Sequence, residues 1–173
     1  MKHLRRFNES ISDVNDLQEV EELFYPLSDE LQLNVKVIKD RYRIINFTKP
    51  IMYHGRADIN RIYNIGRIPD NLVDDPTYPV IRVLITKSPI VSHSLINEPK
   101  YKMDINTFAD ELKFPIDYLL NEKGLRLSQV WASRQANYGN NYPDYLYYKD
   151  LDTLVGDQNM GKSMLSLVLY FGD

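Results

Sequence analysis

The sequence contains no cysteine, three histidines and a single tryptophan in 173 residues. Without cysteine the chain cannot form a disulfide, a thiolate metal site or a cysteine nucleophile, and three scattered histidines offer few ligands for a zinc cluster. No apolar run reaches the about 18 residues that indicate a transmembrane helix. These absences predict a soluble protein with no membrane span, no metal centre and no cofactor.

The chain also lacks an excess of basic charge. Its 24 acidic residues outnumber its 21 lysines and arginines, for a formal net charge of −3. Nucleic-acid binding draws on a basic excess, so this balance argues against a nucleic-acid partner. The basic start, MKHLRRFNES, is followed by no apolar segment of the kind that a secretory signal requires. We expect an intracellular protein with a basic segment over residues 1–10 and a single domain over 11–173.

The spacing of apolar residues predicts an α+β fold. Spacings of three and four indicate a helix over residues 13–25, continuing bent to 30 after Pro26, and a second helix over 104–120 that Pro115 bends. Alternation indicates a β-hairpin with strands over 33–37 and 42–47, and further strands over 51–54, 80–86, 125–133 and 163–171. Shorter helices are expected over 57–65 and 149–155, and a loop over 67–79. Because helices and strands mix without strict alternation, we expect a mostly antiparallel sheet of about five strands, with the two main helices packed on one face.

Two features of the sequence point to association with other proteins. The first helical region carries seven acidic residues and no lysine or arginine, namely Asp13, Asp16, Glu19, Glu21, Glu22, Asp29 and Glu30. Such a run is either a solvated surface or a docking face for a basic partner. The strand over 80–86 has Arg82 as its one protective charge, so it would pair with a copy of itself if it lay at a sheet edge. We therefore expect a protein partner or self-association.

Tyrosine is abundant, and its excess is local. Of 13 tyrosines, five fall within eleven residues, at Tyr138, Tyr142, Tyr145, Tyr147 and Tyr148. Tyrosine mixed with asparagine and glycine is typical of contact loops, because tyrosine gives a large area with few rotatable bonds. The same rings could instead fold back to cover the sheet or occupy an edge strand. The sequence leaves both interpretations open.

The string GDQNMGKS, over residues 156–163, satisfies the phosphate-loop pattern. In that motif backbone N–H groups and the equivalents of Gly156, Gly161, Lys162 and Ser163 hold a nucleotide and its Mg²⁺. A phosphate loop must follow a buried strand and open a helix. Here LDTLV precedes the motif and resembles the end of a short helix, whereas the residues after Ser163 are typical of a strand. Nucleotide binding is one alternative, and a glycine-containing turn is the other.

The segment Tyr53-His54-Gly55, followed by an expected helix and the phrase IGRIP, resembles the first motif of the ADP-ribosyltransferase fold. The resemblance covers about 18 residues. It implies an enzyme using NAD, in which His54 would hold the nicotinamide ribose and Tyr138, in WASRQANYG, would stack on the nicotinamide ring. This chain has Arg56 where family members usually carry threonine or serine.

The first ten residues resemble the N-termini of uncharacterised small proteins of large tailed bacteriophages, in which Met-Lys, a basic pair, Phe, Asn and Glu precede an acidic helix. This resemblance implies a viral accessory or virion-associated protein in the host bacterial cytoplasm or the virion. No nucleophile or base, orienting group and charge stabiliser can be assembled together from the sequence. The sequence thus favours a non-catalytic protein that acts by protein–protein binding or assembly, with the transferase and the nucleotide-binding protein as alternatives.

Overall fold

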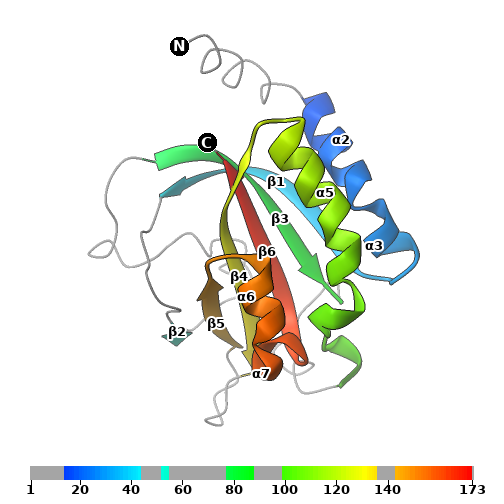
Figure 1. Cartoon of the computed structure of the whole chain (residues 1–173), viewed down its shortest axis with the longest axis vertical. Coiled ribbons are helices and arrows are strands. Elements are labelled where there is room, and N and C mark those ends of the chain that lie inside the picture. The colour runs from blue at the N-terminus through cyan, green and yellow to red at the C-terminus, as the bar shows by residue number, and fades with distance from the viewer. Residues whose placement is uncertain (1–13, 44–51, 55–76, 88–98, 136–142, 173) are drawn as a thin grey trace.

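Six strands form one antiparallel sheet in the computed structural model, which describes residues 14–43, 52–54, 77–87, 99–135 and 143–172 (Figure 1). Across the sheet the strand order is β1-β3-β6-β4-β5-β2. The strands are β1 (Asn34–Arg43), β2 (Met52–His54), β3 (Thr77–Thr86), β4 (Arg126–Gln135), β5 (Pro143–Tyr148) and β6 (Met164–Gly172). Every neighbouring pair is antiparallel. The α+β prediction is confirmed, with six strands in place of about five. The strand predicted over 51–54 is β2, whereas β5 lies in the tyrosine-rich segment, over which no separate strand was predicted.

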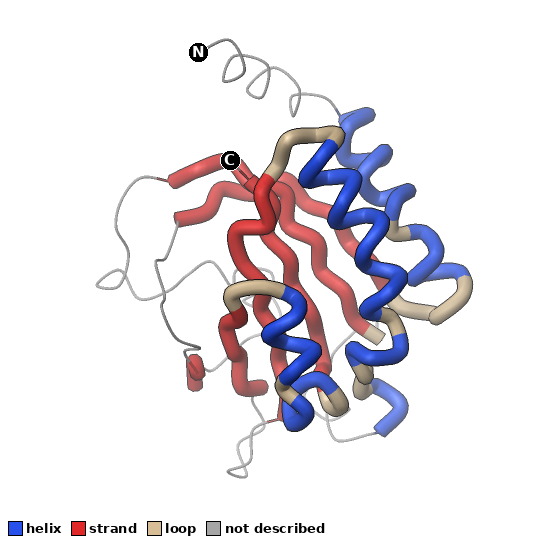
Figure 2. Tube along the Cα trace, viewed as in Figure 1, coloured by secondary structure: helices blue, strands red, loops and turns tan. Residues whose placement is uncertain are grey.

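Within the described ranges, the α-helices lie on one face of this sheet (Figures 1 and 2). They are α2 (Val14–Leu23), α3 (Tyr25–Asp29), α5 (Ala109–Asn121), α6 (Leu151–Gly156) and α7 (Gln158–Gly161), with short 3₁₀ turns η2 (Pro99–Tyr101) and η3 (Ile105–Thr107) ahead of α5. The helices α2 and α3 pack on β1, and α5 packs on β4. The short helices α6 and α7 pack on β5 and β4 respectively. The predicted placement of the two main helices on one face is confirmed.

The core lies between the helices and the sheet. Alternate residues of the central strands point toward the helices, including Ile81, Val83 and Ile85 of β3. They meet Phe24 and Leu112, which have no solvent exposure. All nine residues of β6 are buried, as expected for a strand at the centre of the sheet.

Proline and glycine set the helix boundaries. Pro26 stands at the start of α3, where a missing backbone N–H costs nothing, so the first helical stretch breaks into α2 and α3. Pro115 lies inside α5 without ending it. Gly124 adopts a φ of +67°, a left-handed conformation that glycine reaches without strain, and the chain then turns into β4.

The predicted hairpin over residues 33–47 is wrong. Residues 34–43 form one continuous strand, which pairs with β3 from Asn34 opposite Thr86 to Arg43 opposite Thr77. Asp40 was the only turn signal in this stretch, and it lies within the strand opposite Val80. A single aspartate without a following glycine does not supply the conformation that a two-residue hairpin turn needs. The end of the predicted second hairpin strand lies outside the described residues, as does the expected helix over 57–65.

The strand predicted over 80–86 begins three residues earlier and is not at an edge. β3 lies between β1 and β6, so its backbone is paired on both sides over Ile81–Thr86. Self-pairing was expected only if this strand lay at an edge, and that condition is not met. Its Pro79 pairs with β1 alone, opposite Arg41, beyond the part of β3 that pairs with β6. Proline has no backbone N–H to donate to a neighbouring strand, so it is tolerated at a position that pairs on one side only.

Candidate functional site

The transferase prediction concerns residues that the structure describes only in part. His54 ends β2, where its backbone lies opposite Asp144 of β5. Tyr138 lies outside the described residues, as does Tyr142. The pairing of His54 with Tyr138 around NAD therefore stays a prediction.

The described part of the tyrosine-rich segment belongs to the sheet. Tyr145 stands in β5, with its backbone opposite Tyr53 on one side and Ser133 on the other. Tyr147 and Tyr148 are 7% and 2% exposed to solvent, so neither presents a ring to a partner. For these two residues the structure supports the second interpretation, that of tyrosines that occupy a strand.

The phosphate-loop string has the reverse of the required context. A helix, α6, precedes it and a strand, β6, follows it, as the flanking sequence indicated. The backbone N–H groups of Asn159 and Met160 donate to the carboxylate of Asp157, at 3.0 and 3.1 Å, in the place where a phosphate would bind. The side chain of Lys162 donates to Gln158 (3.2 Å), and the Ser163 hydroxyl donates to the Asn159 carbonyl (3.1 Å).

The second glycine of the string has a packing explanation. Gly161 is buried, and a Cβ at this position would lie 2.9 Å from a methyl carbon of Ile105. The Asp157 side chain caps the start of α7, and the lack of a side chain at Gly161 lets α7 pack closely against η3. These contacts explain the pattern as a helix cap followed by a turn, and they leave the nucleotide-binding prediction without structural support.

Asp157 is the centre of a polar cluster where β4, β5 and α7 meet. Its carboxylate accepts a hydrogen bond from the Tyr148 hydroxyl at 2.8 Å. Burial alone would raise the pKa of Asp157, but the Tyr148 bond, the two backbone bonds and the charge of Arg134 together lower it. Burial, followed by the bond to Asp157, raises the pKa of Tyr148. The cluster thus holds a carboxylate in its charged form and a phenol in its neutral form, an arrangement that locks α7 to the sheet.

The face of the sheet opposite the helices carries a set of buried polar side chains. The residues that alternate with the core positions of β3, β4 and β6 include Arg82, Thr86, Gln129, Ser133 and Ser166, each at most 7% exposed. The Trp131 indole donates to Gln129 (2.8 Å), and the hydroxyls of Ser133 and Ser166 bond each other across β4 and β6 (2.6 Å). Trp131 also meets the edge of the Tyr147 ring, with centroids 5.6 Å apart. On the central strands β3, β4 and β6, the polar side chains of this face are therefore buried.

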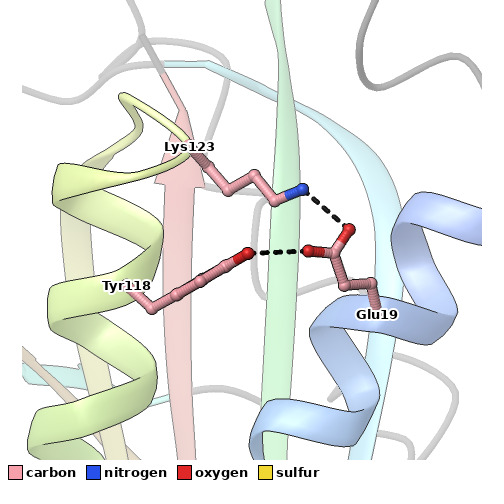
Figure 3. A network of polar contacts seen from close by, with 3 residues as sticks. All are labelled: Glu19, Tyr118 and Lys123. Atoms are coloured by element: carbon pink, nitrogen blue, oxygen red, sulfur yellow. Dashed lines mark hydrogen bonds and ion pairs between the residues drawn. The ribbon is translucent and has the colours of Figure 1, made fainter.

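The helices α2, α3 and α5 lie side by side on the sheet (Figure 1). A partly exposed hydrogen-bonded network joins α2 to α5: the Glu19 carboxylate accepts from the Tyr118 hydroxyl (2.9 Å) and pairs with Lys123 (2.7 Å) (Figure 3). The bonds from Lys123 and Tyr118 lower the pKa of Glu19, and the bond to Glu19 raises the pKa of Tyr118. The network holds the two helices at a fixed spacing.

Two large aromatic side chains project from this layer into solvent. Tyr25, at the start of α3, is 63% exposed, and Phe114, in the middle of α5, is 67% exposed. Phe114 points away from the core face formed by Leu112, Pro115, Ile116 and Leu119, and its ring lies 6.4 Å from that of Tyr118. We call the exposed surface of residues 17–33 and 109–124 the helical face. The acidic residues of α2 were predicted from the sequence, but the exposure of Phe114 was not, although a phenylalanine two positions after Leu112 falls on the opposite side of a helix.

Among the described residues, no three histidine, aspartate or glutamate side chains gather as a metal site. Within the same ranges, none of the helices has the length and apolar character to cross a membrane. Comparisons with protein-family models, with curated proteins and with solved structures give no match.

Proposed function

We propose that this chain is a non-catalytic binding protein that docks on another protein through its helical face. One observation carries the proposal: both of the exposed large apolar side chains among the described residues, Tyr25 and Phe114, lie on this face. Aromatic residues are enriched at protein interfaces and dominate their binding energies. The resemblance of the first ten residues supports a bacteriophage setting for the partner.

The helical face is also suited to docking by its rigidity. The Glu19 network fixes α2 against α5, and the buried side of α5 is anchored by residues such as Leu112 and Leu119, which have no exposure. A partner that binds Phe114 therefore meets a preformed surface, and little ordering entropy is lost on binding.

A comparative capture experiment tests the proposal. The wild-type chain, the double variant Tyr25→Ala/Phe114→Ala and a control are immobilised in equal amounts and exposed to a bacterial extract. The control, Lys162→Ala, alters an exposed residue directly after α7. We expect proteins retained by the wild type and by the control to be lost from the double variant, because truncating a central aromatic residue typically weakens binding by about 2 kcal/mol or more. If all three chains retain the same proteins, the helical face is not the docking surface.

A further inference from the structure

The charge of the helical face restricts the chemistry of its partner. Residues 17–33 and 109–124 contain nine carboxylates, two lysines and no arginine. Each lysine pairs with a carboxylate of the same face: Lys113 with Asp110 at 2.6 Å, and Lys123 with Glu19 at 2.7 Å. The seven carboxylates that remain, on both helical stretches, are Glu21, Glu22, Asp29, Glu30, Glu111, Asp117 and Glu122.

Two of these carboxylates lie next to the exposed Phe114 on α5. Glu111 and Asp117 are both exposed and lie one turn before and one turn after Phe114, so they stand on the same side of α5. An apolar group that contacts Phe114 therefore has a negative charge on either side along the helix. A cationic side chain next to that group would gain from both carboxylates, and an anionic one would be repelled.

We propose that the partner presents a basic amphipathic segment, an inference that rests on the proposed function. In this segment an apolar side chain contacts Phe114, and lysine or arginine residues on either side of it pair with Glu111 and Asp117. A second copy of this chain fits poorly, because two helical faces brought together would repel each other. Anionic partners such as nucleic acid are excluded by the same charge.

Synthetic peptides of about 15 residues serve as probes, a length that can form an amphipathic helix on binding. One peptide combines leucine and lysine, a second has glutamate in place of lysine, and a third keeps lysine but has serine in place of leucine. Fluorescence anisotropy of each labelled peptide gives its affinity at about 0.05 M and about 0.3 M salt, where screening differs strongly. We expect only the leucine–lysine peptide to bind well, with an affinity at least about tenfold higher at the lower salt concentration.

Variants of the chain localise the effect. The double variant Glu111→Gln/Asp117→Asn is expected to bind the leucine–lysine peptide with an affinity about tenfold lower, and with a smaller dependence of that affinity on salt. The control Asn159→Lys, which adds a positive charge to an exposed position on α7, should leave affinity within about twofold. Equal binding of the glutamate peptide, or no loss in the double variant, overturns the proposal. A large gain in peptide affinity on deletion of residues 1–10 would also overturn the proposal. It would show that the chain's own basic segment occupies the helical face.

The outcomes separate this inference from the proposed function. If Tyr25→Ala/Phe114→Ala abolishes capture of a protein while Glu111→Gln/Asp117→Asn does not affect it, the helical face is the docking surface and the basic partner is wrong. If neither variant affects capture, both proposals fail. Sedimentation that shows a dimer lost on Phe114→Ala would identify a second copy as the occupant and overturn the basic partner.

Discussion

Two tyrosine hydroxyls in this molecule each donate to a carboxylate on another element, and each bond ties a helix in place. Tyr118 of α5 bonds Glu19 of α2, and Tyr148 of β5 bonds Asp157 at the start of α7. In both pairs the pKa of the carboxylate is lowered and that of the tyrosine is raised. The tyrosine excess noted in the sequence thus serves, at these two positions, to hold helices on the fold.

Replacing Glu19 with glutamine should reduce stability modestly and in a pH-dependent way. The Glu19 side chain is 41% exposed, so solvent screening limits the loss to about 0.5–1 kcal/mol at neutral pH. Because folding lowers the pKa of Glu19, its contribution is present above the unfolded-state pKa and is lost as the pH falls through the folded-state pKa. The difference between wild type and Glu19→Gln in urea unfolding should therefore shrink below about pH 4. Asp110→Asn, at an 86% exposed ion pair, is the matched control and should leave the unfolding midpoint unchanged.

The serine pair on the buried face of the sheet should behave as a coupled unit. Ser133→Ala leaves the buried Ser166 hydroxyl without its 2.6 Å partner, which costs about 1–3 kcal/mol. The double variant Ser133→Ala/Ser166→Ala removes both polar groups, so it should lose less than the sum of the single variants. Chemical denaturation of the four chains measures the coupling. Strictly additive losses would show that the two hydroxyls do not depend on each other.

At the scale of elements, the short helix α7 depends on one cap. Asp157 accepts two backbone N–H bonds at its start and a third bond from Tyr148. Asp157→Ala should cost about 2–4 kcal/mol, since it removes an N-cap and leaves a buried tyrosine hydroxyl unpaired. Asp157→Asn keeps one acceptor oxygen for the two backbone N–H groups, and its NH2 group can donate to the Tyr148 hydroxyl in place of accepting from it. It should therefore recover most of the loss at low pH, where protonation of the wild-type Asp157 removes the stability linked to its lowered pKa. Thermal unfolding monitored by circular dichroism tests the order wild type, Asn, Ala; equal stability of the Asn and Ala variants would contradict it.

The elements that sequence predicts well are those with an unbroken pattern. The strands β4 and β6 lie close to their predicted ranges because apolar residues run through them, and Gly124 closes the helix that precedes β4 as expected. β1 was misread because Asp40 interrupts an alternation whose continuation is decided by pairing with β3, which is a long-range contact. The exposed position of Phe114 was missed because a search for apolar stripes finds the residues that are buried and passes over those that are not.

At the scale of the whole molecule, the sheet is built to keep its long edge from pairing. β1 forms one edge of the sheet and carries two exposed lysines, Lys36 and Lys39, whereas β2 at the other edge has three residues. Charged residues on an edge strand and short edge strands both prevent addition of another strand. With β3 enclosed, self-association through the sheet would have to use one of these protected edges.

Removing the edge charges should therefore promote self-association. The variant Lys36→Val/Lys39→Val presents an apolar, β-branched edge, and we expect it to form dimers or larger species at concentrations where the wild type is monomeric. Sedimentation velocity at matched concentrations provides the measurement, with Lys162→Val, directly after α7, as the control. A double variant that stays monomeric would show that the lysines do not protect this edge.

The strand order has a consequence for the order in which the molecule can be completed. β6 is the last of the six strands in the sequence, yet it stands between β3 and β4 and joins the two halves of the sheet. During synthesis, β1 with β3 and β4 with β5 can pair as they emerge from the ribosome, but neither half has a neighbour until β6 follows. The nascent chain therefore carries two open strand edges, on β3 and β4, until β6 has been made.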